Sequence, residues 1–350
     1  MSNKRTKSLN RQRGGMRPDF EFQQAIKNGN IQDIRNDINN GMEINEALPN
    51  RRERAIHMAV RNGHVEVVRL LLDSGALINK PDMDDYRPIH FAVNRKDLRE
   101  EGNPMNAKLM DIATLLIERG ADLNKTNTAG DSPLDLAARN GDLEMVKLLV
   151  NHGARIEKPI SGDIEHSRVD RNNPIHKASL NGHLEVVKYL IEKGAKINDP
   201  THEEMYVSPL HEAVKGGNFD VVKYLVDNGA DINATNFAKD KPINMIIDLG
   251  SKPDYPRIED LLMRKGIEDG SFKETDAKYG LKETYKQIQQ GLVKEVLDKH
   301  LKTSDTDIRE EISKFLGGKK NKRTQKRKGT KHKTTKKRTK KQTKTNKRKN

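Results

Sequence analysis

No cysteine occurs among the 350 residues of this chain. Its absence excludes disulfide bonds, thiolate zinc sites and cysteine nucleophiles. A chain without cysteine is compatible with a reducing compartment. We therefore expect an intracellular protein of the cytoplasm or the nucleus.

Long hydrophobic runs are also absent. No apolar run in the chain approaches the roughly 18 residues that are needed to cross a bilayer. The first residues are charged rather than apolar, so no secretory signal is predicted. We expect a soluble protein that does not associate with membranes.

Motifs of catalysis are missing too. The chain has no Gly-x-x-x-x-Gly-Lys-Ser/Thr phosphate loop, no Gly-x-Ser-x-Gly nucleophile turn and no His-Glu-x-x-His pair, each of which carries a known chemistry. His202 and Glu203 begin the last motif, but its second histidine is lacking. We therefore predict no enzymatic activity and no cofactor.

Acidic residues are missing from both ends of the chain. Residues 317–350 contain 18 Lys or Arg and no acid, which leaves 48 basic against 51 acidic residues in the rest. The first 17 residues hold six more basic residues, so residues 18–316 have 42 basic against 51 acidic residues. The net charge of +15 is thus a property of the ends and says nothing about the fold.

What the middle does contain is a repeated phrase, Gly-Ala-x-x-Asn, preceded by an apolar helix. Its glycines are separated by 45, 33, 41 and 35 residues, and they lie at Gly75, Gly120, Gly153, Gly194 and Gly229. A weaker copy begins at Gly41. A period of about 33 residues with insertions is typical of stacked helix-pair repeats.

Each repeat unit predicts two helices. A Pro-Leu-His or Pro-Ile-His phrase opens the unit, as at residues 174–176, and proline suits the first position of a helix. A glycine six residues after the histidine slot, such as Gly182, allows that helix to end. The next segment, as in residues 64–72, has apolar residues at i, i+3 and i+4, which predicts a second helix with one buried face.

These phrases resemble ankyrin repeats, most closely in residues 56–79, 175–198 and 210–233. The resemblance covers residues 19–269, about seven units, of which the first and last have degenerate motifs, as terminal repeats do. It implies an all-α solenoid of helix-turn-helix units with short β-hairpin fingers. It also implies a protein partner bound on the concave face, by a chain that we expect to be a monomer.

Insertions interrupt the repeat at three places. The turn between two helices is lengthened at residues 95–106, and two hairpins are lengthened between Glu157 and Asn173 and between Asp199 and Ser208. The glycine that is usual in the hairpins remains only at Gly130, because the same slot elsewhere contains Asp85, Arg171, Tyr206 or Lys239. We expect those hairpins to depart from the standard turn.

Histidines recur in the repeat and raise the question of a metal site. His57, His90, His176 and His211 share one slot. Equivalent residues of adjacent repeats should lie about 10 Å apart, whereas a Zn–N bond measures about 2 Å. We interpret the ring as a tie between the start of a helix and the neighbouring hairpin, and we expect no metal.

Five apolar residues lie in hairpins, where the repeat core does not require them. They are Met83, Tyr86, Met205, Tyr206 and Phe237. Exposed aromatic and methionine side chains often anchor protein partners, so we predict a partner-binding role. The alternative is that these side chains fill lengthened or glycine-less hairpins.

Residues 270–316 leave the repeat and show helical periodicity, first in residues 281–301 and then more briefly in residues 308–316. We predict a helical extension that packs on the last repeat. The alternative is a separate partner-binding module. The resemblance to viral ankyrin proteins with an F-box-like C-terminus then implies a substrate adaptor for the degradation machinery.

The two basic ends, residues 1–18 and 317–350, are predicted to be disordered. The C-terminal end has charge of one sign and no apolar residue, so it cannot form a core. The C-terminal tail is predicted to bind polyanions through Lys319, Lys320, Arg323, Lys326, Arg327, Lys328, Lys336, Lys337, Arg338, Lys340 and Lys341. Nucleic acid, an acidic protein and a nuclear import receptor are the alternatives, and a merely solubilising tail is another. Its composition resembles that of ankyrin proteins from giant DNA viruses, which implies a host-cell location.

The leading hypothesis is therefore a non-enzymatic adaptor. The repeats would hold a protein partner, and the tail would add electrostatic attachment or nuclear targeting. A nucleic-acid-associated protein that binds through its tail is the first alternative.

Overall fold

The computed structural model describes residues 18–47, 53–94, 103–157, 173–200, 206–248, 252–271, 281–300 and 312. The predicted disordered tail and nearly all of the predicted disordered N-terminus lie outside these residues. Within them the chain forms helices and turns and no strand, which confirms the all-α class. Two compact units are formed, by the residues up to Ile258 and from Glu259 onward.

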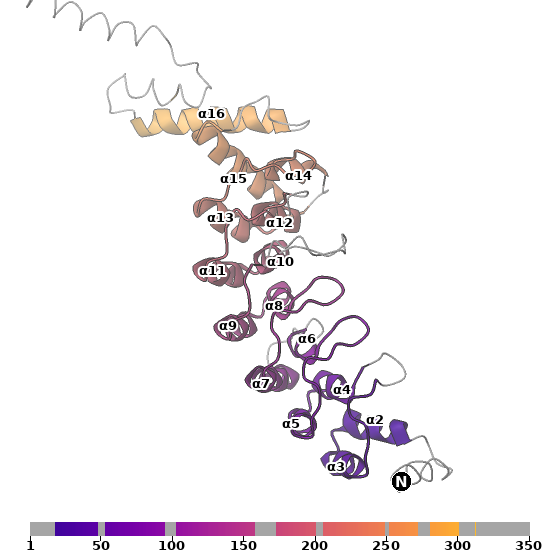
Figure 1. The fold of residues 1–350 in the computed structure, drawn as a ribbon. Coiled ribbons are helices and arrows are strands. Elements are labelled where there is room, and N and C mark those ends of the chain that lie inside the picture. The colour runs from indigo at the N-terminus through magenta and orange to yellow at the C-terminus, as the bar shows by residue number, and fades with distance from the viewer. Residues whose placement is uncertain are drawn as a thin grey trace, which may run out of the picture. The chain divides into compact units, whose positions relative to one another are not determined.

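Helices of the first unit alternate between two rows (Figure 1). The first helices of the repeats are α2 (Pro18–Asn28), α4 (Ala55–Arg61), α6 (Pro88–Val93), α8 (Pro133–Asn140), α10 (Pro174–Asn181), α12 (Pro209–Gly216) and α14 (Pro242–Asp248). The second helices are α3 (Ile31–Asn39), α5 (Val65–Asp73), α7 (Pro104–Glu118), α9 (Leu143–Asn151), α11 (Leu184–Glu192), α13 (Phe219–Asp227) and α15 (Tyr255–Glu268), of which α15 continues into the second unit. Each first helix from α4 to α12 packs against the first helices of both neighbouring repeats.

The first helices begin and end as the sequence predicts. Proline occupies the first turn of α6, α8, α10 and α12, where its missing N–H costs no hydrogen bond. Gly141, Gly182 and Gly217 end α8, α10 and α12 in the left-handed conformation, with φ of 75°, 78° and 73°. Glycine adopts this conformation without steric strain.

The glycine that ends α8 also makes room for the next repeat. His183 places its Nε2 2.9 Å from the Arg139 carbonyl oxygen, one of the helix-end carbonyls that lack a partner within the helix. A Cβ on Gly141 would lie 2.3 Å from the Nδ1 of that ring. His64 and Asn218 contact the preceding repeat's helix end in the same way.

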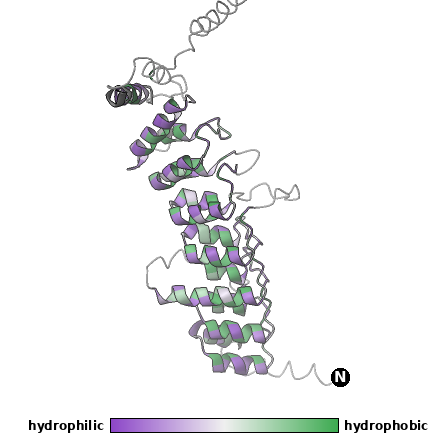
Figure 2. Cartoon of the chain, turned by 90° about the vertical axis from the view of Figure 1, so that its left-hand side faces the viewer, coloured by the Kyte–Doolittle hydropathy of each residue, from purple (hydrophilic) through white to green (hydrophobic). Residues whose placement is uncertain are grey.

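The second helices bury the apolar faces that the spacing predicted. In α5, for example, Val67, Val68 and Leu71 are almost completely buried. Hydrophobic and hydrophilic residues lie side by side along the helices in Figure 2. The prediction that the second helices supply the core is confirmed.

The histidine slot ties a helix start to the next hairpin, as predicted. The Nδ1 of His57 accepts a hydrogen bond from the Arg54 N–H at 3.0 Å. Its Nε2 lies 3.1 Å from the Lys80 carbonyl oxygen and therefore donates to it. His90 makes the same two contacts one repeat later.

The Gly-Ala-x-x-Asn phrase links successive repeats through an amide. The Nδ2 of Asn79 donates to the Gly120 carbonyl at 3.1 Å, and its Oδ1 accepts from the Asp122 N–H at 2.8 Å. Asn45, Asn124 and Asn198 make the same pair of bonds to their next repeats. We call this recurring pair the amide link.

We call the hairpin that precedes a first helix a finger, and three fingers in the described part of the chain are closed by backbone and side-chain bonds. The Asn127 N–H donates to the Asp131 carbonyl at 3.0 Å. In return the Asn127 Oδ1 accepts from the Asp131 N–H at 2.9 Å. The same closure joins Asp82 to Tyr86 and residue 236 to residue 240.

The fingers of Asp85 and Lys239, which lack the glycine, keep the standard turn, and this corrects the expectation for these two. Gly130 has a φ of 81°, and Asp85, Tyr206 and Lys239 take the same left-handed conformation with φ of 58°, 48° and 62°. The closing hydrogen bonds of the finger fix the backbone, and the residue in the slot adapts to it. Arg171 lies outside the described residues.

The insertion at residues 95–106 is not wholly a turn. Helix α7 already begins at Pro104, and the Oδ1 of Asn103 caps it by accepting from the Met105 N–H at 3.0 Å. The side chain of Met105 packs against Gly63, because its Sδ lies 2.3 Å from the position that a Cβ on Gly63 would occupy. It thereby takes the place that His183 has beside Gly141.

The second unit contains α16 (Leu281–His300), which confirms the predicted helical stripe. Tyr285, Ile288 and Leu292 of α16 are buried, and Arg264 pairs with Glu295 at 3.1 Å. The second predicted stripe lies outside the described residues, except for Ile312. The predicted domain boundaries and the docking of this segment on the last repeat stay predictions.

Candidate interaction surface

The fingers project on the side of the first helices, as the loops beside α4, α6 and α8 show in Figure 1. Three predicted binding residues lie exposed on these fingers. Met83 is 58% exposed, Tyr206 is 50% exposed and Phe237 is 79% exposed. Met205 lies outside the described residues. We call the exposed tips of the fingers the finger surface.

Tyr86 behaves differently from these three exposed residues. Its ring centroid lies 5.4 Å from that of Phe91 and 5.7 Å from that of His90, and burial raises the pKa of its phenol. Tyr86 therefore packs against the start of α6, as the alternative interpretation would require. Partner binding by Met83, Tyr86, Tyr206 and Phe237 stays a prediction.

Other exposed apolar side chains were not singled out from the sequence. Leu77 is 49% exposed, Phe20 is 45% exposed and Ile31 is 38% exposed. None of them lies on a described finger. They serve below as matched controls for the finger residues.

Arg61 and Phe91 form a contact that the sequence did not reveal. The guanidinium of Arg61 lies 4.8 Å from the centre of the Phe91 ring, within the range of a cation–π interaction. Arg61 also pairs with Glu53. The sequence did contain a sign of this contact. The third residue after the helix-opening proline is the aromatic Phe91 in this repeat, whereas later repeats have Leu136 and Lys177 at the same position.

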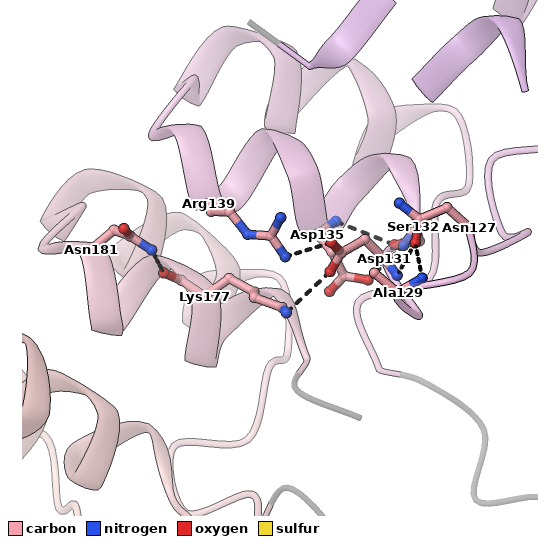
Figure 3. A network of polar contacts seen from close by, with 8 residues as sticks. All are labelled: Asn127, Ala129, Asp131, Ser132, Asp135, Arg139, Lys177 and Asn181. Carbon is pink, nitrogen blue, oxygen red and sulfur yellow. Dashed lines mark hydrogen bonds and ion pairs between the residues drawn. The ribbon is translucent and has the colours of Figure 1, made fainter. Parts of the chain in front are cut away.

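A buried network of charges joins the fourth repeat (α8 and α9) and the fifth (α10 and α11) (Figure 3). Asp131 accepts from Arg139 at 2.5 Å within its own repeat and pairs with the Nζ of Lys177 on α10 at 3.1 Å. The side chains of Asp131 and Lys177 are only 2% and 5% exposed. Charges buried to this degree persist only when they are paired, so the network fastens the two repeats together.

The same network satisfies the start of α8. The Asp135 carboxylate accepts from both the N–H and the Oγ–H of Ser132 at 2.8 Å. Ser132 in turn accepts from the Asp135 N–H through its Oγ, which completes a capping box. Asp135 stands here in the histidine slot, and its role is structural.

Both ring nitrogens of His57 and of His90 are engaged in hydrogen bonds. Burial, with smaller contributions from nearby arginines, lowers the pKa of both His57 and His90 to about 4. Both rings are therefore neutral near pH 7, with Nε2–H donating to a carbonyl and Nδ1 accepting a backbone N–H. Both rings therefore serve as structural hydrogen-bonding groups.

No cluster of three or more metal-ligating side chains is found in the described part of the chain. Among the same residues, no helix combines the length and the apolar character that spanning a bilayer requires.

The sequence matches the ankyrin-repeat family, described as ankyrin repeats in three copies, over residues 22–100, 105–201 and 160–236. These matches cover more than half of the chain. The chain belongs to the ankyrin-repeat family, whose arrays are typically protein-binding domains without enzymatic activity.

Curated relatives share parts of this array. The putative ankyrin repeat protein FPV031 of fowlpox virus is 32% identical over 124 residues, which is 34% of this chain and 33% of the relative. Human protein phosphatase 1 regulatory subunit 27 is 40% identical over 82 residues, which is 23% of this chain and 46% of the relative. The NPR1 protein of Oryza sativa subsp. indica, named for its BTB/POZ domain and ankyrin repeats, is 32% identical over 111 residues, 32% of this chain and 16% of the relative. The chain thus spans less than half the length of each of these relatives.

Solved ankyrin domains share the fold. The human ASB11 ankyrin repeat domain aligns with a TM-score of 0.53 and 21% identity over 69% of this chain and 96% of that domain. The ankyrin repeat domain of Bcl-3, described as a unique member of the IkappaB protein family, aligns with a TM-score of 0.53 and 26% identity over 71% of this chain and 99% of that domain.

Proposed function

We propose that this protein is a non-enzymatic adaptor that binds a protein partner through its finger surface. Met83, Tyr206 and Phe237 are the apolar contacts of that surface. The observation that carries the proposal is the left-handed backbone of three finger residues that are not glycine, with φ of 58°, 48° and 62°.

The left-handed conformation costs a residue with a Cβ about 1–2 kcal/mol, whereas glycine adopts it without that cost. Asp85, Tyr206 and Lys239 are all exposed, so no burial within the fold offsets the cost. Strain of this kind is found where a side chain serves a purpose outside folding. Contact with a partner is such a purpose.

The charges of the fingers define the partner further. Asp84 and Asp85 directly follow the first exposed anchor, Met83, whereas Lys239 lies two residues after Phe237 on the last described finger. A complementary partner would present cationic groups to the first of these fingers and an anionic group to the last. Such complementarity mainly sets specificity and the rate of association.

The experiment that tests this proposal compares two triple variants in affinity purification from cells followed by mass spectrometry. Met83→Ser, Tyr206→Ser and Phe237→Ser together should remove the partner while leaving helicity and melting temperature unchanged. The matched control, Leu77→Ser, Phe20→Ser and Ile31→Ser, removes exposed apolar side chains away from the fingers and should retain the partner. Equal losses in both variants, or no loss in the first, would refute the proposal.

A second function is favoured by the composition of the tail. With 18 Lys or Arg and no acid, residues 317–350 would bind polyanions and support a nuclear location. Log affinity for duplex DNA should fall linearly with log salt and should not depend on base sequence. Full binding by a chain truncated after residue 316 would refute this role.

A further inference from the structure

The ends of the first helices carry charge of one sign. Two residues before the glycine that follows a first helix, the side chain is a cation in four repeats, namely Lys27, Arg61, Arg139 and Lys215. The same position is occupied by Leu180 in α10, and the corresponding residue after α6 is Asn94. We call the four cations the cation row.

The acids of these helices are buried instead. Asp135 and Glu212 are the acidic residues within α4, α6, α8, α10 and α12, and they are 0% and 5% exposed. Every exposed or half-buried side chain of these five helices is cationic or neutral. Residues 18–316 nevertheless have 42 basic against 51 acidic residues. The first helices thus present positive charge on an array whose composition is acidic.

Buried acids hold three cations of the row. The pairs are Arg61 with Glu53, Arg139 with Asp131 and Lys215 with Glu212. The acid side chains are 7%, 2% and 6% exposed, whereas the cations are 41%, 35% and 48% exposed. Figure 3 shows the arrangement at Arg139, whose guanidinium points toward Asp131. A partner that approaches these helices therefore meets the cations and not their acids.

The second helices expose both signs. Their pairs are Arg69 with Glu66, Lys147 with Glu144 and Lys188 with Glu185, and the acid side chains are 65%, 70% and 65% exposed. The cations of these pairs are exposed to a similar degree as those of the row, at 47%, 40% and 40%. The difference between the two faces thus lies in the burial of the acids.

The contacts of the two arginines fix their side chains in advance. The Nη2 of Arg139 donates to Asp131 at 2.5 Å, and Arg61 donates to Glu53 while its guanidinium lies 4.8 Å from the centre of the Phe91 ring. A guanidinium has five N–H donors, so a single bond to a buried acid leaves donors for an external anion. A side chain that its neighbours already hold loses little conformational entropy when it binds.

We propose that the cation row binds an extended, acidic segment of a protein partner. Neighbouring first helices pack about 10 Å apart, so Arg61, Arg139 and Lys215, which lie on alternate repeats, are spaced by about 20 Å. An extended chain advances about 3.3–3.6 Å per residue. Acidic residues about six positions apart in the partner therefore match the row. The half-buried Phe91 and Leu180, on the repeats in between, offer apolar contacts to the same segment.

The spacing favours a peptide over nucleic acid. Duplex DNA carries one negative charge per about 1.7 Å of its axis, which is much denser than one cation per about 20 Å. The row is also separate from the finger surface, because it lies at the ends of the first helices whereas the fingers precede their starts. It is a second contact surface that does not depend on the finger residues.

A local fluorescent reporter in the full chain tests the row. Because the chain has no tryptophan, Leu180→Trp puts a single reporter between Arg139 and Lys215, so that binding at the basic tail alone is not recorded. The probe is a synthetic glycine-serine peptide with three glutamates about six positions apart. The control peptide has the same composition with its three glutamates adjacent. The spaced peptide should change the tryptophan emission and bind more tightly than the control peptide.

Two charge-matched triple variants in this background identify the cations that bind. Arg61→Gln, Arg139→Gln and Lys215→Gln together should weaken binding of the spaced peptide about tenfold or more, because one exposed ion pair contributes a factor of about two to five. The control, Arg69→Gln, Lys147→Gln and Lys188→Gln, removes the same charge from the second helices and should change the affinity less than about twofold. Met83→Ser, Tyr206→Ser and Phe237→Ser should leave it unchanged, which separates the row from the finger surface.

Three results would overturn the proposal. They are equal affinities for the two peptides, equal losses in the two charge-matched variants, and a loss of duplex DNA binding confined to the row variant, which would assign the row to nucleic acid. Circular dichroism checks that each variant folds. If the row variant does not fold, Arg139→Gln decides, because Asp131 keeps its pair with Lys177. It should weaken binding about twofold, and an unchanged affinity would overturn the row.

Discussion

Side chains at the interior junctions of the array are held in place by hydrogen bonds, whereas side chains at the tips of its fingers are exposed. At the junctions, side chains such as His57 and Asn79 are held by two hydrogen bonds each to fixed backbone groups. At the tips, Lys239 and Tyr206 are exposed and lie in a strained backbone conformation. The fold therefore depends on the junctions and gains nothing from these tip side chains.

This difference indicates where stability and recognition are located. The closing bonds of a finger involve backbone groups and the side chain at its first residue, such as Asn127, and not the tip. Tip residues can therefore vary without loss of the fold, whereas replacing a hydrogen-bonded junction residue should cost stability. Substitutions that distinguish the two regions sharpen this comparison, and those below follow in order of decreasing expected effect.

The largest effect is expected in the interior of a second helix. Leu71→Ala should lower the free energy of unfolding by about 2–5 kcal/mol, because a fully buried leucine leaves a cavity and Leu71 is 0% exposed. Chemical denaturation followed by circular dichroism measures this loss. The neighbouring Leu70→Ala is the control, since Leu70 is only half-buried and should cost less. A loss below about 0.5 kcal/mol for Leu71 would mean that this helix does not pack as described.

Acid should weaken the junctions through their histidines. The pKa of His57 and of His90 falls from 6.5 in the unfolded chain to about 4 in the folded one. Between these values the unfolded chain binds a proton that the folded chain does not, so stability falls as pH falls from 6.5 toward 4 and is fully present above 6.5. Each histidine contributes on the order of 3 kcal/mol across this window.

Denaturation midpoints at pH 7, 6 and 5 test this dependence. His90→Asn is the matched variant, because Asn244 occupies the same slot in the last repeat. It should lower stability at pH 7. It should also reduce by about one the number of protons that the chain takes up on unfolding in this pH range, so that stability depends less on pH. Stability that stays constant between pH 6.5 and 5 would contradict the neutral, buried state of these rings.

A smaller loss is expected when a helix-ending glycine is replaced. Gly141→Ala should destabilise by about 1–3 kcal/mol, because φ is 75° and the new Cβ would lie 2.3 Å from the His183 ring. Gly153→Ala shares the left-handed conformation, with φ of 89°, but meets nothing within 4 Å. Thermal melting of the two variants should therefore separate backbone strain from the lost contact, and equal losses would show that the contact is unimportant.

The smallest effect, and one of opposite sign, is expected at a fingertip. Lys239→Gly should leave stability unchanged or raise it by up to about 1 kcal/mol, since it relieves a φ of 62°. Ala238→Gly on the same finger should instead lower the free energy of unfolding by about 0.5 kcal/mol. Ala238 is not in the left-handed conformation, so glycine relieves no strain there and only raises the conformational entropy of the unfolded chain. A clear loss for Lys239→Gly would place this side chain in the fold and remove it from the finger surface.

Much of the array could be predicted from local patterns. Proline before Ile175, glycine at 182 and the apolar spacing of residues 184–190 each specify a helix start, a helix end or a buried face. Such signals act within about one helical turn, so they can be recognised without knowledge of the neighbouring repeat. The structural role of the histidines was also predicted, because one residue type recurring in one slot indicates a repeated contact.

The candidate site was only partly predictable. Tyr86 and Phe237 both lie on fingers, yet Tyr86 packs against Phe91 whereas Phe237 is 79% exposed. The difference depends on an aromatic neighbour that the stacking of helix on finger supplies. Residues 317–350 and Met205 lie outside the described residues, so their predicted roles stay predictions.

The sequence by itself determined the repeat, its period and the identity of each buried slot, because these follow from contacts between residues close along the chain. Only the tertiary structure decided which groups meet across repeats. Asp131 and Lys177 are 46 positions apart in the numbering and pair because α8 and α10 stack against each other. Likewise, the left-handed backbone of Lys239 is imposed by the closing hydrogen bonds of its finger, which override the preference of any single residue.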